Sequence, residues 1–267
     1  MRQPQIGWDY YSLPQLFSLI SDYKRTNSYA EFLLSGVCEG KTVVDCGAGS
    51  GICTWLALKG GAERVIALDI ADHICAYLNI VFINEPRVSV VKCNLITDEL
   101  PEGDLYIHEM VANGLLGEGI TDIFDNLRSQ NITEVYPTHA SVSTASISHG
   151  QIHPSENLDH LLVPEAQEFI QYNTQYMPSH YLLATVDDYS VQDQKLRWHL
   201  DLRDPIPQRV KDTVYSGALV WRVGFDASLS NSYTNANDVN NNWNVKMPYS
   251  TFAARCNLES GALPNKV

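Results

Sequence analysis

The stretch Val43–Gly51, VVDCGAGSG, decides the fold, because apolar residues run straight into a turn rich in glycine and a helical pattern follows from Ile52 to Lys59. Two valines before such a turn are typical of a buried parallel strand. The glycines permit backbone angles and a close approach of a ligand that a Cβ atom would obstruct. The stretch therefore predicts a strand, turn and helix that bind a nucleotide-like cofactor.

The spacing of the glycines separates two classes of cofactor. The dinucleotide fingerprint G-x-G-x-x-G requires a third glycine at position 52, where this chain has Ile52. The chain instead has glycine at 47, 49 and 51, with Asp45 two places before Gly47. This form resembles motif I of the class I S-adenosylmethionine (SAM) methyltransferases, which implies SAM as the cofactor and Asp45, Gly47 and Gly49 as residues of its site. The alternative is a structural glycine turn.

The pattern after residue 40 is typical of alternating strands and helices, with strands expected at about 41 to 46, 64 to 69 and 88 to 93. The carboxyl ends of such parallel strands lie along one edge of the sheet, where ligands bind. Asp69 and Asn94 fall at that edge. We expect Asp69 to accept the ribose hydroxyls of SAM and Asn94 to contact the adenine. The alternatives are a helix N-cap for Asp69 and an ordinary turn for Asn94.

A further segment provides two carboxylates. A strand is expected to deliver Glu109 to the same edge, and a loop of Gly, Asn and small apolar residues brings Glu118 nine positions later. Two acids that face one apolar pocket repel each other unless a cation lies between them. A guanidinium meets that need, because its planar N–H fork matches carboxylates. Glu109 and Glu118 are therefore the candidate catalytic residues.

The segment from Glu109 to Glu118 resembles the double-glutamate loop of the protein arginine methyltransferase family, whose two glutamates have this spacing. Upstream, Asp22-x-x-Arg25-Thr26 resembles the family's D-x-x-R-T, which implies that Arg25 holds the SAM carboxylate. Tyr10 falls where the family has its pocket tyrosine. Residues 135 to 140 are similar to the proline-containing step that leads from the SAM domain to a β-barrel.

The resemblance covers about residues 10 to 249 and implies a fold and a domain organisation. The expected fold class is α/β, a class I SAM-methyltransferase Rossmann-like sheet followed by a smaller β-barrel-like domain. Residues 1–40 are expected to form helices that complete the SAM site, residues 41–137 the SAM-binding domain, and residues 138–267 a trimmed, barrel-like substrate domain. The family's Thr-His-Trp motif is replaced by Asn241-Asn242-Trp243. Trp243 either walls the substrate pocket or anchors its loop on the barrel.

Composition limits the classes of partner. The formal net charge of −13 argues against nucleic acid and anionic membranes and allows a cationic substrate. No run of about eighteen apolar residues and no signal-like amino terminus occur, so we expect a cytoplasmic protein. The six cysteines form no C-x-x-C pair and are expected to be reduced core thiols. The eight histidines form no zinc signature, so no metal is expected.

The expected function is SAM-dependent N-methylation of the guanidino group of arginine, in a protein, in a peptide or as a free metabolite. One alternative is a SAM-dependent methyltransferase of another small amine or carboxylate, in which the two glutamates only line a pocket. Another is a non-catalytic SAM-binding partner subunit. The resemblance also implies a homodimer as one arrangement, and a short helix expected over Gln167–Tyr176 is a candidate remnant of the family's dimerisation arm. His108 is expected to pack in the core, because alternation in a strand points it away from Glu109.

Overall fold

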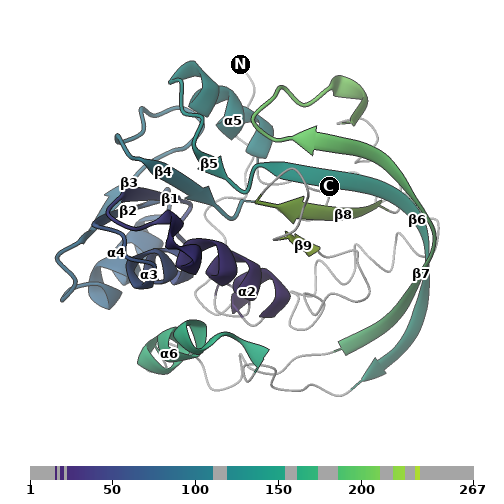
Figure 1. Cartoon of the computed structure of the whole chain (residues 1–267), viewed down its shortest axis with the longest axis horizontal. Coiled ribbons are helices and arrows are strands. Elements are labelled where there is room, and N and C mark those ends of the chain that lie inside the picture. Colours follow the sequence, from purple (N-terminus) through teal and green to yellow (C-terminus); the bar gives the residue numbers. More distant parts are fainter. Residues whose placement is uncertain are drawn as a thin grey trace.

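The computed structural model describes residues 16, 19–20, 23–110, 119–153, 161–173, 186–210, 219–225 and 232–234. Within these residues the chain forms two sheets. Figure 1 shows the first sheet with its helices on one side of the molecule and the long, curved strands β6 and β7 on the other.

The first sheet is parallel and has the strand order β3-β2-β1-β4-β5. Its strands are β1 (Thr42–Cys46), β2 (Arg64–Asp69), β3 (Val88–Lys92), β4 (Leu105–His108) and β5 (Val135–Tyr136). The central strands β1 and β4 are buried along almost their whole length, as expected for strands covered on both faces. The predicted α/β, Rossmann-like fold is confirmed.

Helices connect and cover these strands. They are α2 (Tyr23–Phe32), which continues into the π-helical turn η1 (Leu33–Val37), α3 (Ile52–Lys59), α4 (Asp72–Val81) and α5 (Ile120–Ser129). Right-handed crossovers place α3 and α4 on one face and α5 on the other, because the strand order reverses between β1 and β4. The helices that the structure describes all fall short of the length and apolarity needed to cross a bilayer.

The second sheet is antiparallel, with the strand order β7-β6-β8-β9. Its strands are β6 (His139–His153), β7 (Val186–Asp201), β8 (Leu219–Gly224) and β9 (Ser232–Thr234). The prediction that the chain after residue 138 is mainly β therefore holds for the described residues. Closure of this sheet into a barrel stays a prediction, as do the domain boundaries.

Helix α6 (Pro164–Asn173) lies between β6 and β7 in sequence and packs on α2 and α3. The indole N–H of Trp55 in α3 donates to the carbonyl oxygen of Glu165 at 3.0 Å, and Lys59 forms a 2.9 Å ion pair with Glu168. The helix predicted over Gln167–Tyr176 is thus present but begins three residues earlier. Its role as an arm remnant stays a prediction.

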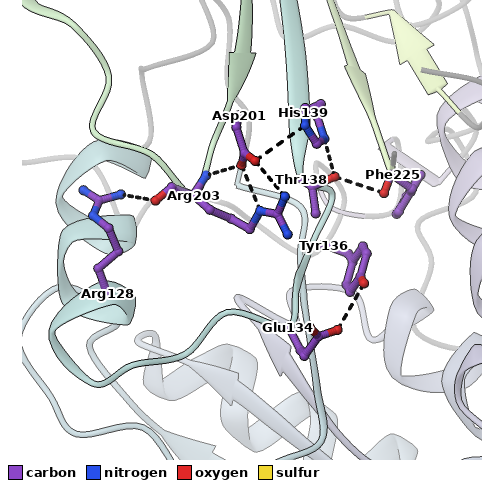
Figure 2. Close-up of polar contacts among 8 residues, drawn as sticks. All are labelled: Arg128, Glu134, Tyr136, Thr138, His139, Asp201, Arg203 and Phe225. Carbon is purple, nitrogen blue, oxygen red and sulfur yellow. Dashed lines mark hydrogen bonds and ion pairs between the residues drawn. The ribbon is translucent and has the colours of Figure 1, made fainter. Parts of the chain in front are cut away.

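A short strap, residues 137 and 138, joins β5 to β6 and ties the two sheets together. The Thr138 amide donates to Gly224 O at 3.1 Å, and Leu202 N donates to Thr138 O at 2.7 Å. The Thr138 hydroxyl donates to Phe225 O at 3.0 Å, as Figure 2 shows. The strap therefore bonds to the ends of both β7 and β8.

A polar cluster surrounds this strap (Figure 2). His139 Nδ1 lies 2.6 Å from the Thr138 hydroxyl, and its Nε2 lies 3.6 Å from Asp201 Oδ2. Arg203 binds both carboxylate oxygens of Asp201, at 2.6 and 2.9 Å. The guanidinium of Arg203 holds the pKa of Asp201 below its ordinary value, so this carboxylate stays charged beside His139.

The conformation and packing of Gly51 predict how its replacement changes the stability of the fold. Gly51 has φ +83°, and a Cβ there would lie 3.0 Å from Leu78 Cδ2 and from Phe82 Cε2. Gly36 has φ +94° but no atom within 4 Å of such a Cβ. Both substitutions to alanine strain the backbone, and Gly51→Ala also overpacks the core. We expect Gly51→Ala to lower the free energy of unfolding by about 2 kcal/mol more than Gly36→Ala, measured by urea denaturation. Equal losses in the two variants would contradict the packing described around the turn.

Candidate active site

The glycine turn lies at the carboxyl end of β1, where the strand order reverses. In open α/β sheets, the crevice at this point is where ligands bind. The amides of Gly47 and Ala48 donate to Leu68 O at 2.9 and 2.8 Å, so the turn is fixed to the end of β2. A Cβ on Gly47 would lie 3.2 Å from Met110 Cγ. The turn therefore packs against the residue that follows Glu109.

Asp69 ends β2 and holds the turn from the other side. One carboxylate oxygen accepts from the Gly49 amide at 3.1 Å, and the other accepts from the Ala71 amide at 2.9 Å. Burial raises the pKa of Asp69, and these backbone hydrogen bonds oppose that rise. A carboxylate has about four acceptor positions, so Asp69 retains capacity to accept from a hydroxyl group. The structure thus brings Gly49 and Asp69 together, as the sequence predicts.

Asp45 points into the protein, toward helix α3. Its Oδ2 accepts from the Thr54 hydroxyl at 2.7 Å, and the residue is 2% exposed. Burial raises its pKa to about 6. Asp45 therefore braces the turn against α3, and a direct contact of Asp45 with the cofactor stays a prediction.

Asn94 follows β3 and shapes the turn there. Its side-chain oxygen accepts from the Ile96 backbone amide at 3.1 Å. The backbone amide of Asn94 donates to Asp98 Oδ2 at 2.8 Å. These are the bonds of the ordinary turn that was the alternative for this residue. Contact of Asn94 with the adenine stays a prediction.

Glu109 directly follows β4, so it stands at the predicted edge of the sheet. Arg25 Nη1 from helix α2 lies 2.9 Å from Glu109 Oε1, and Arg25 Nη2 donates to Leu19 O at 2.6 Å. The Arg25 side chain is 4% exposed and that of Glu109 is 26% exposed. Burial raises the pKa of Glu109, and the guanidinium of Arg25 opposes this rise. Among the described residues Glu109 bonds to Arg25 through Oε1, which leaves Oε2 to accept from another cation.

His108 packs in the core, as predicted. It is fully buried, its Nε2 lies 3.0 Å from Pro137 O, and its ring lies edge-on to Phe124 at 5.2 Å. A carbonyl partner requires Nε2 to carry the proton. Nδ1 is the one buried side-chain nitrogen or oxygen among the described residues that lacks a hydrogen-bond partner. Burial lowers the pKa of His108 to about 4, so the ring is neutral at pH 7.

Tyr29 is a residue of the site that sequence reasoning missed. Its hydroxyl donates to His108 O at 2.6 Å, and the side chain is almost fully buried. Tyr29 follows Arg25 by four residues in α2, so both side chains lie on one face of that helix. This spacing from Arg25 is the signal that could have identified it.

Three predicted residues, Tyr10, Glu118 and Trp243, lie outside the described residues. Their roles as pocket tyrosine, second carboxylate and pocket wall therefore stay predictions. Within the described ranges, no group of three or more His, Cys, Asp or Glu side chains could hold a metal ion.

The comparisons with known proteins point to one family. No family model matches the chain. The histone-arginine methyltransferase CARMER of Drosophila mojavensis is 29% identical to it over 143 residues, which make up 51% of this chain and 26% of that protein. The probable histone-arginine methyltransferase CARMER of Drosophila melanogaster is also 29% identical over 143 residues, 51% of this chain and 27% of that protein. The chain thus spans about a quarter of the length of the curated relatives that it matches.

Solved structures share its fold. Arabidopsis thaliana protein arginine methyltransferase 10 superposes with a TM-score of 0.56 and 18% identity, over 87% of this chain and 81% of that one. The Trypanosoma brucei PRMT1 enzyme-prozyme heterotetrameric complex with AdoHcy gives a TM-score of 0.54 at 17% identity, over 79% and 73% of the two chains. A PRMT6 structure with SAH gives 0.53 at 14% identity, over 92% and 89%.

The buried histidine makes stability depend on pH. The pKa of His108 is about 4 in the folded chain, against an ordinary value of 6.5. Between pH 6.5 and 4 the unfolded chain therefore binds a proton at His108 that the folded chain does not bind. This difference does not affect the free energy of unfolding above about pH 6.5. As the pH falls from 6.5 to 4, it lowers the free energy of unfolding by up to about 3 kcal/mol. We expect His108→Gln, whose amide can still donate to Pro137 O, to flatten the fall in unfolding free energy over this range.

Chemical denaturation at several pH values measures this effect. The matched control is His73→Gln, which makes the same change at an exposed histidine of α4. Identical pH slopes for the wild type and His108→Gln would show that His108 is not held neutral by burial.

Proposed function

We propose that this chain, which belongs by sequence similarity and fold with the protein arginine methyltransferases, is a SAM-dependent N-methyltransferase of the arginine guanidino group. One observation carries the proposal. Glu109 stands at the switch point of the sheet, next to the glycine turn, with Oε1 paired to Arg25 at 2.9 Å and Oε2 available to a second cation. A carboxylate in that position suits a guanidinium that must meet a cofactor bound at the turn.

The residues around the turn suit SAM. Gly47 and Gly49 have positive φ, a backbone conformation that suits glycine, and they form the turn beside Asp69. Asp69 would accept from the ribose hydroxyls, while Arg25 would hold the methionine carboxylate and Asn94 would lie near the adenine. The AdoHcy and SAH named for two structural neighbours support the same cofactor. Bound SAM supplies an electrophilic methyl group.

The two glutamates would prepare the substrate for that methyl group. An arginine side chain enters protonated, since its pKa is above about 12. Glu109 and Glu118 hold the guanidinium through the nitrogens that are not methylated and draw positive charge toward them, which leaves a lone pair on the target nitrogen. Orientation and charge placement supply most of the acceleration. Glu118 then accepts the proton that the methylated nitrogen loses.

The proposed substrate is arginine in a protein. The curated relatives are named histone-arginine methyltransferases, and histones are basic proteins that suit a chain of net charge −13. A peptide, or free arginine, would suit a smaller substrate domain. The heterotetramer named for one neighbour supports an oligomer, with a homodimer as the simplest form. The five free thiols of the described residues suit the reducing cytoplasm.

A second candidate function is methylation of another small amine or carboxylate. The observation that favours it is Asn241-Asn242-Trp243 in place of Thr-His-Trp, because the substrate-side histidine is missing. Mass spectrometry distinguishes the two functions. We expect reactions with SAM and an arginine-rich protein to add one or two methyl groups to guanidine nitrogens. Reactions with an arginine peptide library, free L-arginine and guanidino metabolites determine the substrate size. SAM binding without methylation of any guanidine would favour the second candidate or a non-catalytic subunit.

Glu109→Gln tests the central carboxylate. This variant keeps the shape of the Glu109 side chain but removes its charge. The substrate guanidinium therefore loses its charged partner, while the glycine turn stays intact. We expect the rate of methyl transfer to fall by at least about a hundredfold, with the affinity for SAH, measured by calorimetry, changed by less than about threefold.

The matched control is Glu85→Gln. Glu85 also pairs with an arginine, Arg87 at 2.7 Å, but it precedes β3 and lies at the opposite end of the sheet. We expect this variant to keep the wild-type rate. Glu109→Gln at full activity would rule out the proposed role of Glu109.

A further inference from the structure

Helix α2 holds Glu109 at two points. Arg25 pairs with the Glu109 side chain, and one helical turn later the Tyr29 hydroxyl donates to His108 O at 2.6 Å. That oxygen belongs to the peptide group that joins His108 to Glu109. Both anchoring residues are buried.

The bond from Tyr29 constrains Glu109 through the geometry of the peptide group. The carbonyl of His108, the amide of Glu109 and the two flanking Cα atoms lie in one plane. A hydrogen bond that fixes the oxygen therefore also fixes the position of the Glu109 Cα. This constraint matters because β4 ends at His108, and Glu109 is the first residue beyond the strand.

The second sheet keeps Tyr29 in place. The ring of Phe225, which follows β8, meets the ring of Tyr29 at right angles with 4.9 Å between the centroids. The carbonyl of Phe225 is in turn bound by the Thr138 hydroxyl of the strap, as Figure 2 shows. Rotation of Tyr29 away from His108 would have to displace this ring. The preceding residue of the strap, Pro137, accepts from the His108 ring at 3.0 Å, so the strap also holds the side chain of His108.

We propose that Tyr29 is a positioning residue, which orients Glu109 so that Oε2 faces the substrate guanidinium beside the cofactor. Its effect on catalysis rests on the function proposed above. Its effect on Glu109 is a property of the folded chain and can be measured without turnover.

Tyr29→Phe removes only the hydroxyl that bonds to His108 O. The chain offers a matched control on β4 itself, because the Tyr106 hydroxyl donates to Pro101 O at 2.8 Å, in the segment before the strand. Tyr106→Phe removes the same group from the same kind of bond. We expect Tyr29→Phe to lower kcat about tenfold with the KM for SAM unchanged, and Tyr106→Phe to keep the wild-type kcat. Rates are normalised to the SAH-binding stoichiometry from calorimetry, so that loss of folded protein is not counted as loss of positioning.

The second measurement is the pH titration of the Glu109 carboxyl carbon by ¹³C NMR, with the resonance assigned from Glu109→Gln. Release of Glu109 toward solvent should move its midpoint in Tyr29→Phe, toward the ordinary value for glutamate, and leave it unchanged in Tyr106→Phe. Phe225→Leu, which removes the ring beside Tyr29 and keeps the hydroxyl, should produce a smaller change in the same direction. It also replaces Tyr29→Phe if that variant does not fold.

Each outcome decides something. An unmoved Glu109 titration in Tyr29→Phe and Phe225→Leu, or an equal loss of kcat in Tyr29→Phe and Tyr106→Phe, would overturn the proposal. A wild type that methylates no guanidine would overturn the proposed function instead, and the titration alone would then decide whether Tyr29 positions Glu109.

Discussion

The pairing of Arg25 with Glu109 is the interaction on which the candidate site depends. Glu109 lies at the carboxyl edge of the parallel sheet, where partial burial raises its pKa, and the guanidinium from α2 opposes that rise. Arg25 bonds to Oε1 of Glu109, so among the described residues Oε2 can still receive a second cation. The N-terminal helix is therefore part of the site, although it precedes the sheet in sequence.

The position of Glu109 follows from the topology of the sheet. The strand order reverses between β1 and β4, and Cys46 and His108 are register partners at their ends. The residues that come next, the glycine turn and Glu109, are consequently neighbours. Packing of Met110 against Gly47 brings the two segments into contact, so a methyl donor at the turn and a guanidinium at Glu109 would meet at this edge. The second sheet supports this region through the strap at Thr138 and through the ring of Phe225, which packs against Tyr29.

The strands and their ends could be predicted from the sequence, because they follow from local patterns of apolar residues. Apolar runs located β1, β2 and β3 to within a residue, and the edge positions of Asp69 and Glu109 followed from strand ends. Helix α6 begins at Pro164, a residue common in the first turn of helices, and the predicted start at Gln167 missed that signal. Tyr29 could not be found from strand patterns, because its partner His108 is 79 residues away in the chain. The turn made by Asn94 was foreseen only as an alternative, since asparagine suits both a turn and a base contact.

The carboxyl resonance of Glu109 reports whether this residue binds a guanidinium beside the cofactor. It would be titrated by ¹³C NMR in the SAH-loaded chain, with and without an arginine-containing peptide. A bound guanidinium favours the charged carboxylate, so we expect the peptide to lower the pKa of Glu109. An identical titration with and without saturating peptide would show that this carboxylate is not the group that holds the substrate.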